Sequence, residues 1–371
     1  MAEAKVTPAR DAAQVAALLN LPEVRALYET LDRLRWTGRT GYGARALVGM
    51  CLVKSLYCIP VWTRVVALVR DHAALRDVLG CTPSEWACYR FTRRLREHPD
   101  LLTATLDAVV ERVRETVPGY GDTLAIDGSD LPAYANGQRR LFKDGPERTN
   151  WSDPDASWGH RSAVGTRKGG GYYGYKVHAA VCATTDLPVA WHVATARDAE
   201  KPYVPLVLDI AARRGIVPTV AVLDRGYDAQ PVHDLLTGRG VRPVIPLTNS
   251  ERVKRGEHRA PTCEHGTWTF GGADAANART KWRCPTGECA PKSVWVKADR
   301  LHPLIPRETE RYRALYRRRV AVEREFGRLK NEWAMLPLRV RRLDRVALHV
   351  DLTMLAMLSN ALLRRDLAAA A

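Results

Sequence analysis

The stretch from Arg311 to Trp333 constrains the fold of this chain more than any other. It contains no Pro and one Gly, Gly327, and its apolar residues recur at helical intervals, which predicts one continuous helix. Four of its polar residues are spaced three, four and seven positions apart. At about 100° per residue these steps sum close to whole turns, so we expect the four side chains to share one face. They are Tyr316, Arg319, Glu323 and Lys330.

This face would present a carboxylate flanked by two cations and a phenol. Divalent metal ions prefer carboxylate ligands, and Arg and Lys bind phosphate groups. The same residues would also suit a solvated helix face held by salt bridges. The helix alone therefore leaves two interpretations open, a face that binds metal and phosphate or a solvated one.

The pattern Tyr316-x2-Arg319-x3-Glu323-x6-Lys330 resembles, in full, the Y-R-E-K signature of bacterial insertion-sequence DDE transposases. The resemblance implies an α/β fold with a ribonuclease H-like catalytic core, in which Glu323 is the third catalytic acid. It also implies that Tyr316, Arg319 and Lys330 contact DNA phosphates. Two catalytic aspartates, each at the end of a strand, should then lie earlier in the chain.

Two short apolar runs supply such aspartates. The run at 123–126 leads into Asp127 and then Gly-Ser, and the run at 220–223 leads into Asp224 and then Arg-Gly-Tyr. A carboxylate at a strand end is a usual metal ligand in α/β folds, although an aspartate before Gly also forms turns. The strand–Asp–x–Gly–Tyr sequence resembles the second catalytic block of the same transposases. We expect elements in the order β-β-β-α-β-α around these two residues.

The charge of the chain predicts a polyanionic partner. The net charge is +16, from 57 basic and 41 acidic residues. Half of this excess lies around the predicted helix, because residues 311–345 hold twelve Lys or Arg against four Asp or Glu. A basic field of this kind indicates nucleic-acid binding. The resemblance to transposases implies that the partner is DNA, namely the element's ends and a target. We expect a homodimer or a larger assembly on that DNA.

Neither end of the sequence predicts a secreted or membrane protein. The first twenty residues lack the apolar core of a signal peptide, and the apolar run from Leu343 to Leu363 is interrupted by Asp344, Arg345, His349 and Asp351. Eight cysteines in 371 residues suit reduced thiols or a metal site better than a disulfide framework. We therefore expect a cytoplasmic protein without a membrane span.

Residues 1–118 are predicted to form an all-helical domain. A helix at 84–97 follows the capping box Thr82-Pro83-Ser84-Glu85. Short helices that end with a basic one suit a helix-turn-helix-like DNA-binding module, and they suit equally a bundle that packs on the core or mediates dimers. The basic residues of the last of these helices are Arg90, Arg93, Arg94 and Arg96.

A polar loop and two strands follow the first aspartate. Residues 136–171 show no periodicity, which predicts a functional or disordered loop. Strands are predicted at 172–183 and 187–194, and the first places Lys176 and His178 on one side. They belong to a block resembling one in the same transposases, so we expect phosphate or water contacts near the site, with a basic sheet edge as the alternative. Loop residues suited to DNA backbone contacts are Arg139, Arg140, Lys143, Arg148, Arg161, Arg167 and Lys168.

A β-rich insertion is predicted between the second aspartate and the signature helix, with strands at 267–270, 281–284 and 293–298. The pairs Cys263-x-His265 and Cys284-x4-Cys289 would hold a structural zinc ion or remain ordinary reduced thiols. The sequence does not select which of three tryptophans are core residues and which, if any, stacks on an unpaired base. They are Trp268, Trp282 and Trp295.

These observations predict three domains and one reaction. The N-terminal helices span 1–118, the ribonuclease H-like core spans 119–245 and 308–371, and the insertion spans 246–307. The resemblance implies that Asp127, Asp224 and Glu323 hold two Mg²⁺ ions, which Mn²⁺ can replace, to cut element ends and join the 3′-OH to target DNA. Two alternatives stay open: a metal-dependent nuclease without strand transfer, and a catalytically inactive DNA-binding relative.

Overall fold

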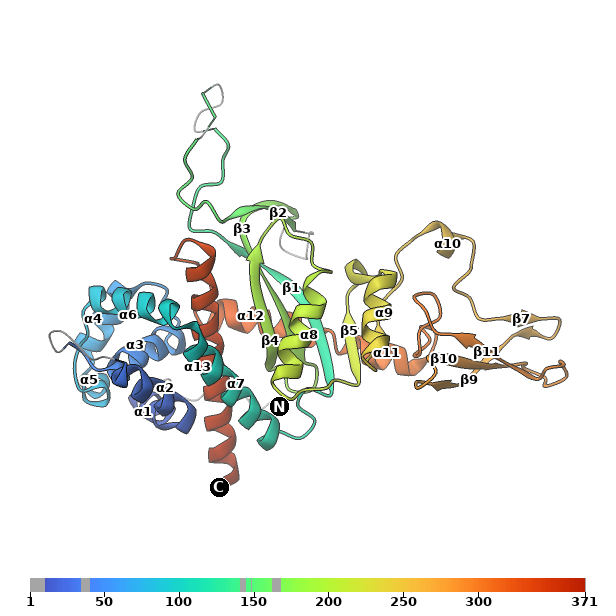
Figure 1. Cartoon of the computed structure of the whole chain (residues 1–371), viewed down its shortest axis with the longest axis horizontal. Helices are drawn as coiled ribbons and strands as arrows, with labels where there is room; N and C mark the ends of the chain where they lie inside the picture. The colour runs from blue at the N-terminus through green and yellow to red at the C-terminus, as the bar shows by residue number, and fades with distance from the viewer. Residues whose placement is uncertain (1–10, 35–40, 141–144, 148, 162–167, 371) are drawn as a thin grey trace, which may run out of the picture.

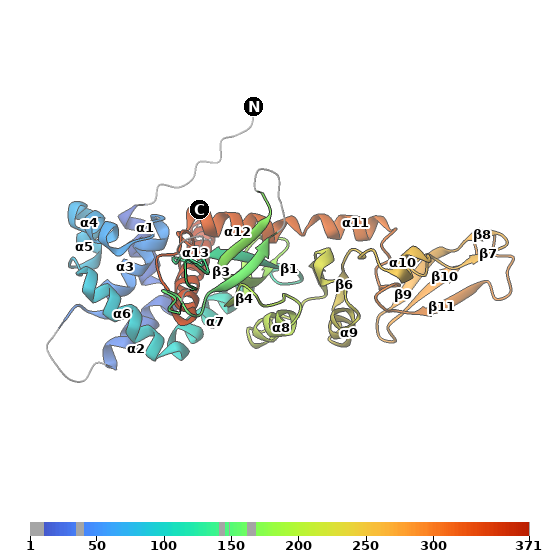
Figure 2. The same cartoon turned by 90° about the horizontal axis from the view of Figure 1, so that it is seen from above.

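The computed structural model describes residues 11–34, 41–140, 145–147, 149–161 and 168–370. Helices from the N-terminal part of the chain lie at one end, a mixed sheet lies in the middle, and a small β-rich part lies at the other end (Figures 1 and 2). The candidate DNA contacts Lys143, Arg148 and Arg167 lie outside the described residues.

The part of the chain before the sheet is helical, as predicted. Its helices are α1 (Ala12–Asn20), α2 (Pro22–Arg33), α3 (Ala44–Leu56), α4 (Trp62–Asp71), α5 (Ala73–Leu79), α6 (Glu85–Glu97) and α7 (Pro99–Thr116). The start of α6 differs from the predicted capping box, because Ser84 rather than Thr82 is the N-cap. The Ser84 hydroxyl accepts the Ala87 N–H at 3.3 Å.

The central sheet has the strand order β2-β3-β1-β5-β6, and β4 also pairs with β3. β1 runs antiparallel to β3 and parallel to β5, which is itself parallel to β6. The predicted element order is present, with one extra strand, β2, inside the predicted loop. The strands are β1 (Thr123–Pro132), β2 (Ser157–Arg161), β3 (Gly170–Cys182), β4 (Pro188–Thr195), β5 (Val220–Leu223) and β6 (Arg242–Val244).

Strand β1 is longer than predicted. We expected it to end at Asp127, but it continues to Pro132 because β3 pairs with it along that whole length. Its parallel pairing with β5, in contrast, stops at Ile126. Asp127 therefore lies just beyond the end of the pairing with β5, but in the middle of the pairing with β3.

Helices cover both faces of the sheet. α8 (Tyr203–Arg213) and α9 (Gln230–Gly238) lie on one side, and α11 (Glu310–Arg317) and α12 (Val320–Glu332) lie on the other (Figure 2). The apolar side of α8 packs on β3 and β4, whereas α12 packs on β1 and β3.

The single helix predicted for 311–333 is in fact two helices. At the junction the Arg319 N–H donates to the Tyr316 carbonyl and the Val322 N–H donates to the Arg319 carbonyl, each at three residues' separation. This tighter turn changes the rotation between the two helices. As a result α11 packs on β6, whereas α12 packs on β1 and β3. No Gly or Pro at the junction indicates this break in the sequence.

The C-terminal helix α13 (Leu343–Ala370) runs between the N-terminal helices and the sheet, where it packs on α7, α3 and β4 (Figure 1). Its segment Leu343–Arg365 has a mean hydropathy of 1.6 and is long enough to cross a membrane, yet 67% of that segment is buried inside the molecule. The core position accounts for its apolar character. One hydrophobic core joins the N-terminal helices, α13 and the sheet. Because this core crosses the predicted boundary at residue 118, the structure does not separate the first two predicted domains, and the boundaries stay a prediction.

The insertion forms a separate small sheet. β10 (Arg279–Arg283) pairs with β9 (Thr269–Asp274) and β11 (Ser293–Lys297), and β7 (Thr262–Cys263) pairs with β8 (Gly266–Thr267). A four-residue helix, α10 (Glu251–Lys254), precedes them. The structure selects among the tryptophans, since Trp268 and Trp282 are buried whereas Trp295 is 46% exposed.

Candidate active site

Sheet register brings the two predicted aspartates together. Ile126 of β1 pairs with Leu223 of β5 in the last step of their parallel ladder, so the next residue of each strand is an aspartate at the same sheet edge. Asp224 then caps the short 3₁₀ turn Arg225–Tyr227, since its Oδ1 accepts the Gly226 N–H at 2.7 Å. The positions of both carboxylates thus depend on the pairing of two buried apolar strands.

The surroundings of Asp127 disfavour its negative charge. Burial raises the pKa of Asp127 to about 7, and the nearby carboxylates of Asp224 and Glu200 add to the rise. The Gly128 N–H and the Arg319 guanidinium oppose it. A cation placed among these acids would therefore be strongly stabilised.

Arg319 lies between two of the three predicted catalytic acids. Its guanidinium is 3.2 Å from Asp127 Oδ2 and also forms a salt bridge with Glu323. The Glu323 side chain stays 51% exposed. Among the described residues these carboxylates do not form a compact set of ligand atoms. The Arg319 cation balances the charges of Asp127 and Glu323.

The other two signature residues contact different partners. Lys330 Nζ is 3.4 Å from Asp130 Oδ1 on β1. Tyr316 stacks on Tyr312 with ring centroids 6.1 Å apart and packs against the buried Val220 of β5. Tyr316 therefore lies on α11, whereas Glu323 and Lys330 lie on α12 and Arg319 lies at the junction. The phenol of Tyr316 still lies close enough to Arg319 to raise the pKa of its guanidinium.

Lys176 and His178 lie on β3 next to α8. The ring of His178 is 2% exposed and stacks on Tyr203 at 4.1 Å between centroids. Burial lowers the pKa of His178 to about 3, so the imidazole is neutral. Lys176 Nζ forms a 2.8 Å salt bridge with Glu200. Lys176 is thus paired with a carboxylate and His178 is buried, and their contacts with DNA stay a prediction.

Glu200 and Tyr227 belong to the site, and sequence reasoning gave neither a role. Glu200 precedes α8, pairs with Lys176 and is hydrogen-bonded to the hydroxyl of Tyr227, which is 1% exposed. Tyr227 lies in the strand–Asp–x–Gly–Tyr block, whose resemblance was a usable signal. Glu200 follows no strand and carries no motif, so only the tertiary structure identifies it.

A basic cavity of about 610 Å³ lies between α3, α6 and α13. Most of its cations come from the predicted basic helix and from the segment before α13, while Lys54 comes from α3 and Arg345 from α13. The exposed side chains of Trp86 and Tyr89 also line it. Arg94 instead turns inward and donates to the Leu31 carbonyl. The Lys and Arg residues that line the cavity are Lys54, Arg90, Arg93, Arg96, Arg339, Arg341 and Arg345.

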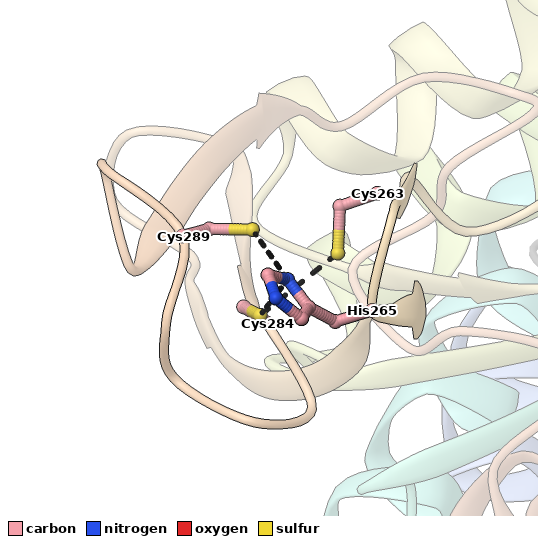
Figure 3. A group of neighbouring side chains, drawn as sticks. All are labelled: Cys263, His265, Cys284 and Cys289. Atoms are coloured by element: carbon pink, nitrogen blue, oxygen red, sulfur yellow. Dashed lines mark hydrogen bonds between the residues drawn. The ribbon is translucent and has the colours of Figure 1, made fainter.

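The four predicted zinc ligands of the insertion also meet. One candidate ligand atom from each lies within 4.8 Å of all the others, and the side chains point toward a common centre (Figure 3). We call this group the Cys/His cluster; it comprises Cys263, His265, Cys284 and Cys289.

Comparisons with known proteins identify the family of this chain. A family model described as "Transposase DDE domain" matches residues 121–359, well over half of the chain. A solved piggyBac transposase synaptic complex with hairpin DNA matches at a TM-score of 0.42 and 12% identity, over 97% of this chain and 77% of that one. No curated protein matches. The family model decides the assignment: this chain belongs to the transposases with a DDE domain.

Proposed function

We propose that this protein is the transposase of an insertion sequence, which cuts DNA at the element's ends and joins the freed 3′-OH to target DNA. The observation that carries the proposal is the placement of Asp127 and Asp224 side by side where the β1–β5 ladder ends, with Arg319 linking Asp127 to Glu323. The family assignment and the basic charge of the chain support it. The sheet joins four strands in antiparallel pairs, β1, β2, β3 and β4, to β5 and β6, which run parallel to β1, and this arrangement supports a ribonuclease H-like core.

The carboxylate site, meaning Asp127, Asp224 and Glu323, fits divalent metal ions. Its acids are hard oxygen ligands. Burial, together with the neighbouring carboxylates of Asp224 and Glu200, raises the pKa of Asp127, so a bound cation would favour its charged form. When bound, two Mg²⁺ ions would stabilise the attacking and leaving oxygens of an in-line displacement, and Mn²⁺ would serve in their place. The protein's own part is to hold the three carboxylates and to exclude other geometries.

Arg319 has two roles in this proposal. In the structure its guanidinium neutralises Asp127 and Glu323. When its partners Asp127 and Glu323 hold metal ions, the guanidinium would be available to a DNA phosphate, to which it would donate two parallel N–H bonds. Lys330 would act likewise from its place beside Asp130. Tyr316 would contact the DNA backbone from α11, where it packs against the apolar cluster of β5 and β6.

The basic cavity would hold another part of the DNA. Its arginines and its exposed aromatic rings suit a phosphate backbone with an unstacked base. Two element ends need two active sites, so we expect a dimer or larger assembly on DNA. Such an enzyme would act in the cytoplasm, where bacterial chromosomal DNA lies.

The test is a joining reaction with purified protein, linear DNA that ends in the element's inverted repeats, a supercoiled target plasmid and Mg²⁺. We expect joined element–target products, and none with Asp224→Ala. Cutting without joining would make the protein a metal-dependent nuclease. Binding without cutting in both Mg²⁺ and Mn²⁺ would make it an inactive DNA-binding relative.

A further inference from the structure

We propose that the Cys/His cluster binds one structural Zn²⁺ ion, which fastens the β7–β8 hairpin to the loop between β10 and β11. Cys263 and His265 come from the hairpin, whereas Cys284 and Cys289 lie just after β10 and in the loop that follows (Figure 3). Residues from two segments about twenty positions apart thus supply one ligand set of three thiols and one imidazole. Tetrahedral sulfur–nitrogen sets of this kind are typical of structural zinc.

The spacing of the ligand atoms matches a tetrahedral zinc ion. With Zn–S near 2.3 Å and Zn–N near 2.0–2.1 Å, tetrahedral geometry places two sulfurs about 3.8 Å apart and a sulfur and a nitrogen about 3.6 Å apart. The Cys263 and Cys284 sulfurs are 3.9 Å apart. His265 Nδ1 lies 3.4 Å from the Cys289 sulfur and 3.9 Å from that of Cys284. A disulfide would need sulfurs about 2.05 Å apart, and these cysteines are free.

The surroundings of the cluster orient its ligands. While His265 Nδ1 points at the sulfurs, its Nε2 lies 3.0 Å from the carboxylate of Glu288. A metal-bound histidine usually donates its other ring N–H to a carboxylate in this way, which selects the tautomer and raises the ligand's basicity. The Thr286 hydroxyl lies 3.5 Å from the Cys284 sulfur. Glu288 and Thr286 thus help to orient His265 and Cys284.

The small hydrophobic core of the insertion explains why a bound ion would stabilise it. Its buried core consists of Trp268, Trp282 and Cys284, with a few half-buried neighbours. Sheets this small seldom bury enough apolar surface to offset the entropy of ordering the chain, and a bound metal supplies the missing stability. We therefore expect the zinc to act as a folding element of the insertion, distinct from the metal ions of the carboxylate site.

Metal analysis of protein purified under reducing conditions without added metal tests the proposal. We expect about one zinc atom per chain, and loss of that zinc in Cys284→Ser and in Cys289→Ser. Cys289 is the more exposed of the two, so its variant keeps the test decisive if Cys284→Ser fails to fold. The control is Cys81→Ser, a partly buried thiol in the N-terminal helices, which should keep its zinc. Glu288→Gln should weaken zinc binding by roughly 10- to 100-fold.

Hydrogen exchange gives a second reading. Removing zinc with a chelator should speed amide exchange in β7–β11 while β1 and β3 stay protected. Zinc well below one atom per chain, with no uptake of added zinc by the reduced protein, would overturn the proposal. So would iron in place of zinc, or a disulfide among these cysteines in freshly purified protein.

Discussion

The carboxylate site and the Cys/His cluster are built in opposite ways. The carboxylates are hard oxygen ligands at the edge of a sheet that belongs to the main hydrophobic core. The cluster offers thiols and an imidazole on a small sheet with a core of its own. Ligands of the first kind suit Mg²⁺ and those of the second suit zinc.

The supports differ as much as the ligands do. At the carboxylate site, Asp127, Asp224 and Glu323 are placed by the pairing of β1 with β5 and by the packing of α12 on the sheet. Arg319 meanwhile balances two of the three charges. In the insertion the fold itself would depend on the ion. Removing metal from the carboxylate site should therefore abolish cleavage, whereas removing it from the Cys/His cluster should unfold part of the insertion.

The largest effect should come from the three acids. Asp127→Ala, Asp224→Ala and Glu323→Ala should each lower cleavage by about a thousandfold or more, because the metals supply several kcal/mol and 1.36 kcal/mol is a tenfold change in rate. DNA affinity should remain close to that of the wild type, since it comes mainly from basic residues. Cleavage and gel-shift assays on end-containing DNA measure both. Wild-type cutting by Glu323→Ala would disprove the assignment of the third acid.

Metal removal should separate the two sites. A chelator that strips both metals should abolish cleavage and also loosen the insertion. Adding back Mg²⁺ alone should leave β7–β11 open to amide exchange, whereas adding zinc alone should close them and leave cleavage absent. Exchange mass spectrometry and a cleavage assay on the same samples follow the two responses. If Mg²⁺ alone restored protection of the insertion, the contrast between the sites would be wrong.

Glu325 sharpens the definition of the carboxylate site. It lies two residues from Glu323 on α12, but it is 0% exposed and forms a salt bridge with Arg328. Burial raises its pKa to about 7, and the Arg328 contact opposes the rise. The native state therefore holds a proton that the unfolded chain loses above about pH 4.3. The stability from this group is present below that pH and is lost as pH rises through 7.

Glu325→Gln should remove this loss. We expect the variant to be more stable than the wild type at pH 8 by roughly 1–3 kcal/mol, with little difference at pH 4. Its cleavage rate should be unchanged. Denaturant unfolding at the two pH values gives the free energies. A large loss of cleavage in Glu325→Gln would place this acid in the site after all.

The smallest effect concerns the cations beside the acids. Arg319→Ala and Lys330→Ala should each reduce the slope of log K against log salt by about 0.9 on duplex DNA, as expected for one lost phosphate contact. Arg318→Ala is the matched control, since Arg318 is exposed at the same helix junction. Affinities across a salt series, measured in Mg²⁺, provide the slopes. Unchanged slopes in both variants would mean that these cations serve only the salt bridges seen in the structure.

The sequence by itself determined much about this protein. Apolar runs ahead of Asp127 and Asp224, and the periodic helix that carries Glu323, predicted elements close to those observed. These patterns are local, because strand and helix periodicity act over a few residues. The resemblance of the signature helix led to the family that the domain comparison supports. Cysteine and histidine spacing indicated a zinc site and the ordinary-thiol alternative together.

Tertiary structure decided how these pieces meet. The pairing of Ile126 with Leu223 sets the two aspartates side by side, and helix packing carries Arg319 to Asp127. Packing also divides the predicted helix at Arg318–Arg319, and it places Glu200 beside Lys176 and Tyr227. Likewise it buries Trp268 and Trp282 and leaves Trp295 exposed. Such arrangements join residues up to two hundred positions apart, and pairing and packing over that range leave no periodic trace in the chain itself.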